Sequence, residues 1–287
     1  MTIVGCGDSV LGPSTSPLLE AWSPNLGIHS FQWQDNIQQP HLDPLFRMGL
    51  VRGIRLDYNA ESENAARWAK ERGADVLCIF GNDYLRRPNI EDEFDQAIGS
   101  NPSVDYWEIG NEVGLFAEMS PQEYMPIFMK LHRHVQINHR GLVIAPYAPV
   151  GGDEGAEAFE TMMSIGLRRY ATEMRSIPLI SLHVYSNSMA FFLKIKKELE
   201  RLPIGINVWV TETGVPDFSQ QIKHVLDYYP KLRKMFRASR IYWYVASECT
   251  EFSLVGGLAD TCDGPVQYSP LYTGLTGIET PPTLGGE

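Results

Sequence analysis

Eight short runs of apolar, often β-branched or aromatic residues recur along the chain, and stretches with helical spacing separate them. Consecutive starts lie between 23 residues (53 to 76) and 38 residues (104 to 142) apart, enough for a strand, a helix and two loops. Near-continuous apolar runs are typical of parallel strands buried on both faces. Eight such units in 287 residues predict an α/β fold, a single (β/α)8 TIM barrel. The expected strands span residues 26–32, 53–58, 76–80, 104–109, 142–147, 179–185, 207–211 and 240–245.

Helix signals lie between these runs. The segment Ser120-Pro121-Gln122-Glu123 is a capping box with proline at the first helical position, and it predicts a helix to about residue 139. Residues 61–72 and 187–202 are expected to be helical up to the Gly and Pro that follow them. A further helix is expected after residues 215–217, and Pro230 is expected to break or kink it.

Composition narrows the domain organisation and the partners. No linker divides the chain, so residues 1–279 are expected to form the barrel and residues 280–287 a loose tail. The 24 Lys and Arg against 35 Asp and Glu give a net charge of −11, which disfavours nucleic acid and anionic membranes as partners. No apolar run approaches the roughly 18–20 residues of a membrane span. We therefore expect a monomer that binds a neutral ligand.

The start of the chain and its cysteines leave some points open. Residues 1–8 contain no visible signal peptide, which fits a cytoplasmic protein or an extracellular one in mature, processed form, so the localisation stays unassigned. Cys78 fits a core position, and Cys249 and Cys262 could pair. Because no CxxC or HExxH pattern occurs, we expect neither a metal nor another cofactor.

The ends of the expected strands carry polar and aromatic residues where a barrel of this kind places its active site. Arg55 belongs to strand two, Asn111 and Glu112 follow strand four, and Glu212 ends strand seven. Two carboxylates from opposite sides of one barrel mouth are what glycoside hydrolysis requires. Either Glu alone would equally fit a solvated loop residue or an ion-pair partner. The placement of Glu112 and Glu212 at the ends of two strands of one barrel favours a catalytic pair.

The motifs resemble those of the clan A retaining glycoside hydrolases, and they come closest to families 39 and 5. Asn111-Glu112 resembles the clan's strand-four pair, which implies that Glu112 is the general acid/base. Glu212 in Trp209-Val210-Thr211-Glu212-Thr213-Gly214 resembles the strand-seven nucleophile. By the same resemblance, a second group is implied to contact the substrate or the nucleophile: Asn111, Arg55, His183, Tyr185 and Trp243. In family 5 a proline commonly follows the acid/base, whereas Val113 stands here.

The roles of the two acids also follow from their surroundings. Arg55 and the Tyr185 hydroxyl would hold the pKa of Glu212 low, and the negative charge on Glu212 would raise the pKa of Glu112. Strand neighbours point to opposite faces, so Asn111 and Glu112 share one site only if the strand has ended or bulged there.

Packing is the competing explanation for the other residues of interest. His183 also fits a core histidine, Trp243 barrel filling, and Arg55 a pair with Asp57 or another acid. Four further aromatic residues near the expected mouth could stack on sugars, and we expect Trp33 to bind substrate in this way. The other three are Tyr58, Tyr84 and Tyr147. The histidines of the helix after strand four are expected to be surface or packing residues: His132, His134 and His139.

The sequence therefore predicts a retaining β-glycosidase that uses Glu212 and Glu112 in double displacement. Short connections suggest an open cleft with residues 151–155 at its rim, and hence internal cleavage of a neutral β-linked oligo- or polysaccharide. Three alternatives remain: a sugar-binding barrel without activity, a transglycosylase with the same residues, and a metal-dependent hydrolase that uses His29 and His183.

Overall fold

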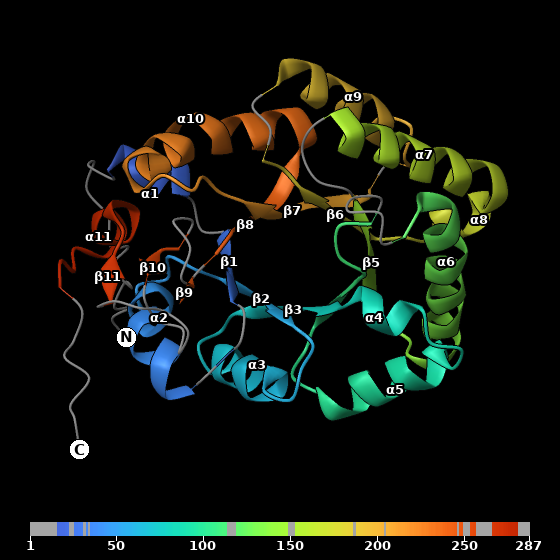
Figure 1. Ribbon diagram of the computed structural model, residues 1–287, viewed down its shortest axis with the longest axis horizontal. Helices are drawn as coiled ribbons and strands as arrows, with labels where there is room; N and C mark the ends of the chain where they lie inside the picture. Colours follow the sequence, from blue (N-terminus) through green and yellow to red (C-terminus); the bar gives the residue numbers. More distant parts are fainter. Residues whose placement is uncertain are drawn as a thin grey trace, which may run out of the picture.

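Eight parallel strands form a closed barrel with helices around it (Figure 1). The computed structural model describes residues 16–22, 26–30, 33, 35–113, 119–148, 153–185, 188–203, 205–245, 247–248, 253–256 and 266–280. Each strand pairs with the next in chain order, and the first pairs with the last, with Leu26 opposite Ile241. The predicted (β/α)8 barrel is thus confirmed.

Every expected strand overlaps an observed one, with ends that differ by up to two residues. The barrel strands are β1 (Leu26–Ser30), β2 (Gly53–Asp57), β3 (Asp75–Phe80), β4 (Tyr106–Ile109), β5 (Val143–Ala148), β6 (Leu179–His183), β7 (Asn207–Thr213) and β8 (Ala238–Trp243). Strand β6 ends before Val184 and Tyr185, and β7 extends two residues beyond the expected end at Thr211. Both differences place polar residues at the same end of the barrel.

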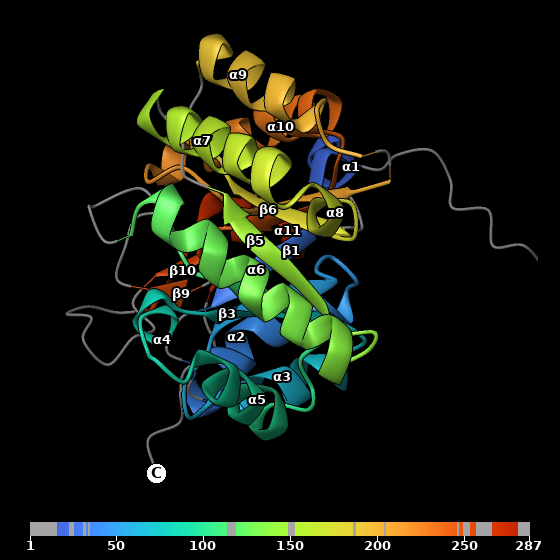
Figure 2. The ribbon, with the colours of Figure 1, turned by 90° about the vertical axis from the view of Figure 1, so that its right-hand side faces the viewer.

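Helices cover the outside of the barrel, and Figure 2 shows α6 and α7 in front of β5 and β6. The capping box is present at α6, where the Ser120 hydroxyl accepts a hydrogen bond from the Glu123 amide and the Glu123 carboxylate accepts one from the Ser120 amide. The helices are α1 (Pro17–Trp22), α2 (Asp35–Arg47), α3 (Ser62–Lys70), α4 (Asn82–Leu85), α5 (Ile90–Ser100), α6 (Pro121–Asn138), α7 (Asp153–Arg169), α8 (Ala171–Met174), α9 (Met189–Leu199) and α10 (Phe218–Phe236).

Of the break or kink expected at Pro230, the break is wrong, because α10 continues through the proline for six more residues. Proline removes one backbone hydrogen bond from a helix. Here the buried side chains of Tyr228, Tyr229 and Leu232 flank the proline and pack against the barrel. Burial of this apolar face on both sides of Pro230 outweighs the lost hydrogen bond.

A small sheet and a last helix, which the sequence pattern did not indicate, lie beside α2 at one side of the barrel (Figure 1). They comprise β9 (Ser247–Glu248), β10 (Val255–Gly256), β11 (Gln267–Tyr268) and α11 (Pro270–Thr276). The Tyr272 hydroxyl donates to the His41 carbonyl over 2.6 Å, and the Tyr268 hydroxyl lies 3.0 Å from His41 Nδ1. These contacts join the last described segment to α2.

Large side chains fill the barrel opposite small ones. The rings of Tyr106, Trp209 and Tyr242 pack inside it together with aliphatic side chains of neighbouring strands. At Gly27, an added Cβ would lie 2.2 Å from the Tyr242 ring. Glycine is therefore required on β1 because Tyr242 occupies the space that a side chain there would need.

Several further expectations concern particular segments. Cys78 is a buried free thiol on β3, as expected, whereas Cys249, Cys262 and the tail residues 281–287 lie outside the described residues. Of the expected cleft rim, residues 153–155 begin α7, and residues 151–152 lie outside the described ranges. Among the described helices, none combines the length and apolarity needed to cross a membrane.

Candidate active site

The chain turns sharply where β4 ends, and this turn brings Asn111 and Glu112 to the barrel mouth. Gly110 has a φ of 85° and Glu112 a φ of 50°, so the extended conformation has ended after Ile109. Asn82, at the start of α4, holds the turn: its Nδ2 donates to the Asn111 carbonyl over 2.6 Å, and its Oδ1 accepts from the Asn111 amide over 2.9 Å. Asn111 and Glu112 can therefore share one site, because the strand has ended before them.

Strand β7 reaches the same result through a register shift. Leu182 pairs with Val210, but the next residue, His183, pairs with Glu212, so Thr211 is an extra residue in β7. Bulges re-aim side chains in this way. The Thr211 hydroxyl donates to Glu108 inside the barrel, and the adjacent Glu212 carboxylate also faces inward, where Arg55 and Tyr185 contact it.

Arg55 is the centre of the site, and its side chain is fully buried. A guanidinium has five N–H donors, and each of these has a partner. Nε donates to Glu108 Oε2 over 2.7 Å, and Nη1 donates to Glu212 Oε1 and to His29 Nδ1. Nη2 donates to Asn111 Oδ1 over 3.2 Å and to His183 Nε2 over 3.0 Å. The expected alternative was a pair with Asp57 or another acid, and Arg55 does pair with two other acids, Glu108 and Glu212.

Glu108 is a site residue that the sequence reasoning missed. Its carboxylate is fully buried and accepts hydrogen bonds from Arg55 and from the Thr211 hydroxyl. Burial opposes its ionisation, but Arg55 and His183 outweigh burial and lower the pKa of Glu108 to about 2. The alternation along β4 could have revealed it, since Glu108 and Tyr106 point inward while Trp107 and Ile109 belong to the outer core.

Glu212 is held as an anion. Its side chain is 5% exposed. Burial raises the pKa of this carboxyl. The charges of His183 and Arg55 and the hydrogen bond from the Tyr185 hydroxyl at 2.8 Å lower it by more than burial raises it, so the net pKa lies below its usual value. The same negative charge and the burial raise the pKa of Tyr185 well above its usual value, so the phenol keeps its proton as a donor.

Glu112 faces Glu212 across His183. One carboxylate oxygen of each Glu and one ring nitrogen of His183 all lie within 4.8 Å of one another. His183 Nδ1 lies 3.5 Å from Glu112 Oε1 and 3.2 Å from Glu212 Oε2. Because His183 Nε2 accepts from Arg55, the neutral ring carries its proton on Nδ1, between the two acids. Glu112 is 24% exposed, so it reaches solvent more freely than Glu212 does.

The charge of His183 depends on the same network. Burial lowers the pKa of the imidazole, but Glu212, Glu108 and Glu112 outweigh burial and raise it above the usual value. His29 behaves in the opposite way, because burial and the charge of Arg55 lower its pKa despite Asp57 and Glu212. The two histidines on either side of Arg55 thus differ in how readily they gain a proton.

The structure does not place either predicted tryptophan at this site. Trp243 is fully buried between β8 and helices α1 and α10, with ring centroids 6.4 Å from Trp22 and 5.8 Å from His224. Strand alternation explains this, because Tyr242 points into the barrel and its neighbour must point outward. Trp33 is 2% exposed and packs 5.0 Å from Trp68 of α3.

Among the described residues, Tyr244, directly after β8, borders the site together with Tyr185. Its centroid lies 5.5 Å from that of His29 and 6.0 Å from that of Tyr185. The other stacking candidates, Tyr58 and Tyr84, pack on each other at 5.2 Å, and the side chain of Tyr147 lies outside the described part of the structure. The expected strand, residues 240–245, included Tyr244, whereas β8 ends at Trp243, so the sequence pattern did not indicate this residue.

The group of Glu112, His183 and Glu212 also has the ligand types and spacing of a metal site. Two observations favour a different use. The Arg55 guanidinium, whose pKa is raised further by Glu108 and Glu212 despite its burial, contacts the same Glu212 carboxylate and would repel a cation. One imidazole nitrogen of His183 is already occupied by Arg55.

Solved structures with a similar barrel include several glycoside hydrolases. The chain superimposes on a GH128 endo-β-1,3-glucanase from Lentinula edodes with a TM-score of 0.61, 14% identity, and coverage of 88% of this chain and 99% of that one. For an endo-1,4-β-D-mannanase from Thermotoga petrophila the TM-score is 0.54 at 12% identity, with coverage of 76% of this chain and 87% of that one. For a family 17 β-1,3-glucanosyltransferase from Rhizomucor miehei the TM-score is 0.56 at 14% identity, with coverage of 83% of this chain and 95% of that one.

These similar structures share a TIM barrel, and at such identities the likeness shows the fold. No protein-family model matches the chain. No curated protein sequence matches it either. The neighbours therefore show the fold, and an activity, a substrate and its residues have to be argued from the site itself.

Proposed function

We propose that the protein is a retaining β-glycosidase that cleaves a neutral β-linked polysaccharide by double displacement. The observation that carries this proposal is that one carboxylate oxygen of Glu112 and one of Glu212 lie within 4.8 Å of each other at the barrel mouth. Retaining enzymes hold their two carboxyl groups about 5–5.5 Å apart, whereas inverting ones leave about 6.5–9.5 Å for a water molecule. The short separation favours direct attack by a carboxylate.

Glu212 is the proposed nucleophile. Arg55, His183 and the Tyr185 hydroxyl lower its pKa, so it is ionised and oriented when the substrate binds. Its carboxylate attacks the anomeric carbon while the bond to the leaving oxygen breaks, which gives a glycosyl ester. The Tyr185 and Arg55 donors remain close to the ester oxygens and stabilise the carboxylate when it leaves in the second step.

Glu112 is the proposed acid/base. In the first step it donates its proton to the leaving oxygen, and in the second it removes a proton from the attacking water. With 24% of its side chain exposed, Glu112 can exchange its proton with solvent.

Asn111 and Tyr244 are proposed to bind the sugar. Because Asn111 Oδ1 accepts from Arg55, the amide NH2 is the part that can donate to the 2-hydroxyl. Tyr244 offers an aromatic ring beside His29 and Tyr185. Internal cleavage is proposed because the similar structures include an endo-β-1,3-glucanase and an endo-1,4-β-D-mannanase, and a neutral substrate because the net charge is −11.

The test is a panel of β-glucans, mannans, xylans and galactans, with product size and anomeric configuration followed over time. We expect oligosaccharides from one class, formed first as the β-anomer. Glu212→Gln and Glu112→Gln should each lose nearly all turnover, while Glu200→Gln, at the solvent-exposed end of α9, should match the parent. Products formed first as the α-anomer would contradict the retaining mechanism, and unchanged turnover in Glu212→Gln would contradict the role of the pair.

A transglycosylase is the second candidate, because one similar structure is a β-1,3-glucanosyltransferase. The two activities share the ester and differ in the acceptor that resolves it. Elongated products at high oligosaccharide concentration, with little reducing sugar released, would assign transfer. A metal-dependent hydrolase predicts loss of activity with EDTA, whereas the proposed mechanism predicts no change.

A further inference from the structure

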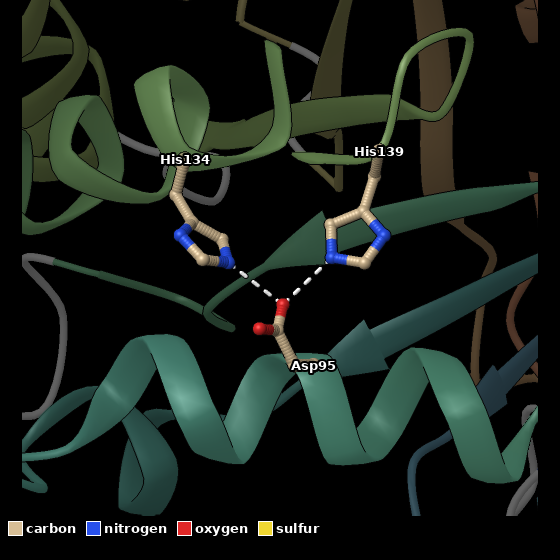
Figure 3. A group of neighbouring side chains, drawn as sticks. All are labelled: Asp95, His134 and His139. Carbon is tan, nitrogen blue, oxygen red and sulfur yellow. Dashed lines mark hydrogen bonds and ion pairs between the residues drawn. The ribbon is translucent and has the colours of Figure 1, made fainter. Parts of the chain in front are cut away.

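A second cluster of titratable side chains lies outside the barrel, between α5 and α6 (Figure 3). It consists of Asp95 on α5, His134 in the last turn of α6, and His139 at the end of that helix. Both imidazole Nε2 atoms lie 2.7 Å from the same oxygen of Asp95, Oδ1. The proposed reaction at the mouth makes no use of this cluster.

The three side chains supply the donor set of a transition-metal site. Two imidazole nitrogens and one carboxylate oxygen all lie within 4.8 Å of one another, and this combination is common around Zn²⁺ and other first-row metal ions. In a tetrahedral site with bonds near 2.1 Å, neighbouring ligand atoms are roughly 3.4 Å apart. Each Nε2 therefore has to retreat from Oδ1 by less than about 1 Å, which side-chain rotation can supply.

The cluster is partly exposed to solvent, and the backbone of one of its histidines is hydrogen-bonded to α6. Exposed fractions of 43%, 14% and 26% for Asp95, His134 and His139 leave room for an ion and for water as a further ligand. The backbone of His139 is held by a hydrogen bond from its amide to the Val135 carbonyl at 2.9 Å. Figure 3 shows both rings directed at Asp95 from above, with one carboxylate oxygen pointing away from them.

The second ring nitrogen of His134 has a carboxylate near it. Glu91 Oε1 lies 4.0 Å from His134 Nδ1, and a metal-bound imidazole donates its other N–H to a carboxylate of this kind. Asn138 Nδ2, 3.1 Å from the same atom, is an N–H donor, so on metal binding the Asn138 amide has to turn its oxygen toward Nδ1.

We propose that Asp95, His134 and His139 bind a divalent transition-metal ion of the Zn²⁺ class and that this ion links α5 to α6. Such a link stabilises the folded chain, because the unfolded chain does not hold the three ligands together. Its position between two outer helices separates it from the proposed chemistry at the mouth. The competing explanation is a pair of histidine–aspartate hydrogen bonds that binds no ion.

The test is titration of the chelator-treated full chain with Zn²⁺ by calorimetry, and with Co²⁺ by visible absorption. We expect one ion per chain and a rise in Tm with Zn²⁺. Asp95→Asn and His139→Gln should each remove the tight binding and the Tm shift, and Glu91→Gln should weaken binding about tenfold. Asp92→Asn changes an exposed carboxylate on the same helix and should bind as the parent does.

Three results would overturn the proposal. The first is no saturable binding of either ion by the parent chain. The second is binding that persists unchanged in both Asp95→Asn and His139→Gln, with circular dichroism showing folded variants. The third is binding lost in Glu112→Gln but kept in Asp95→Asn, because that pattern would place the ion at the barrel mouth. Activity is not needed as a readout, so the result is independent of the proposed glycosidase.

Discussion

At the scale of single residues, one buried cation organises two buried anions. Arg55 directs one edge of its guanidinium to Glu108 and another to Glu212, and it uses its remaining donors on two histidines and Asn111. Charged groups this deeply buried are tolerated only when they are paired and hydrogen-bonded. The pairing also decides chemistry, because it leaves Glu212 ionised with one oxygen on Tyr185.

Tyr185→Phe tests how Glu212 is kept ionised. The variant loses the hydrogen bond from the phenol to Glu212 Oε2, so the pKa of Glu212 should rise. Activity requires ionised Glu212, and the acid side of the kcat/KM profile should therefore move to higher pH. A hydrogen bond to a charged group contributes about 1.5–3 kcal/mol, so kcat/KM at neutral pH should fall about 10- to 100-fold. An acid limb that stays in place would contradict this role.

Glu108→Gln tests the buried anion that does not face the mouth. Its pKa of about 2 in the folded chain lies below the ordinary 4.5, so its ionisation stabilises the fold above pH 4.5, and that stability is lost as pH falls toward 2. This linkage amounts to roughly 3 kcal/mol. Urea unfolding of parent and variant should therefore show a large difference at pH 7 that narrows below pH 4.5. A difference independent of pH would argue against this ionisation.

At the scale of elements, the site depends on two places where strands stop being regular. The left-handed turn after β4 presents Asn111 and Glu112 together, and the extra residue in β7 presents Thr211 and Glu212 together. Ordinary alternation would have turned one member of each pair toward the helices. The carboxylates can meet because both irregularities lie at the same end of the barrel.

Gly110→Ala tests the β4 turn, and Gly73→Ala is its matched control. Both glycines have positive φ, 85° and 74°, but an added Cβ at Gly110 would lie 3.2 Å from Asn82, Leu85 and Tyr124, whereas at Gly73 no atom lies within 4 Å. Each variant should lose about 1 kcal/mol of stability from the backbone conformation. Only Gly110→Ala should also lower kcat, because it displaces the turn that carries Glu112. Equal kcat values in the two variants would separate the turn from catalysis.

The sequence predicted elements better than orientations. Apolar runs located all eight strands, and the polar residues at their ends located six of the residues that meet at the mouth: Arg55, Asn111, Glu112, His183, Tyr185 and Glu212. The same runs did not locate the register shift in β7, which depends on pairing with β6. The resemblance implied that Trp243 of strand eight lies at the mouth, but it did not indicate that this ring points outward toward α1.

At the scale of the whole molecule, closure of the barrel depends on complementary volumes inside it. Tyr242 fills the space above Gly27, and its hydroxyl lies 3.0 Å from where a Cβ at Gly53 would lie. Such interlocking between β8, β1 and β2 cannot be deduced from any one strand. It keeps the strand ends in place, and with them the groups at the mouth.

Gly27→Ala tests this closure, with Gly81→Ala as the control. The new methyl group would lie 2.2 Å from the Tyr242 ring, so the barrel has to shift, whereas an added Cβ at Gly81 meets nothing within 4 Å. Overpacking of this kind costs at least about 1–3 kcal/mol. Thermal unfolding should show a lower Tm for Gly27→Ala only, and Tyr242→Leu in the same chain should restore part of it. A Tm unchanged by Gly27→Ala would contradict the packing argument.

The central claim is that the Glu212 carboxylate attacks the sugar, and covalent trapping tests it most directly. A 2-deoxy-2-fluoro glycoside with a good leaving group, built on the sugar that the substrate panel identifies, should inactivate the enzyme one-to-one. Digestion and mass spectrometry should then place the fluoroglycosyl ester on the peptide that contains Glu212. A label on any other side chain, or turnover without an ester while products form with inverted configuration, would contradict the account.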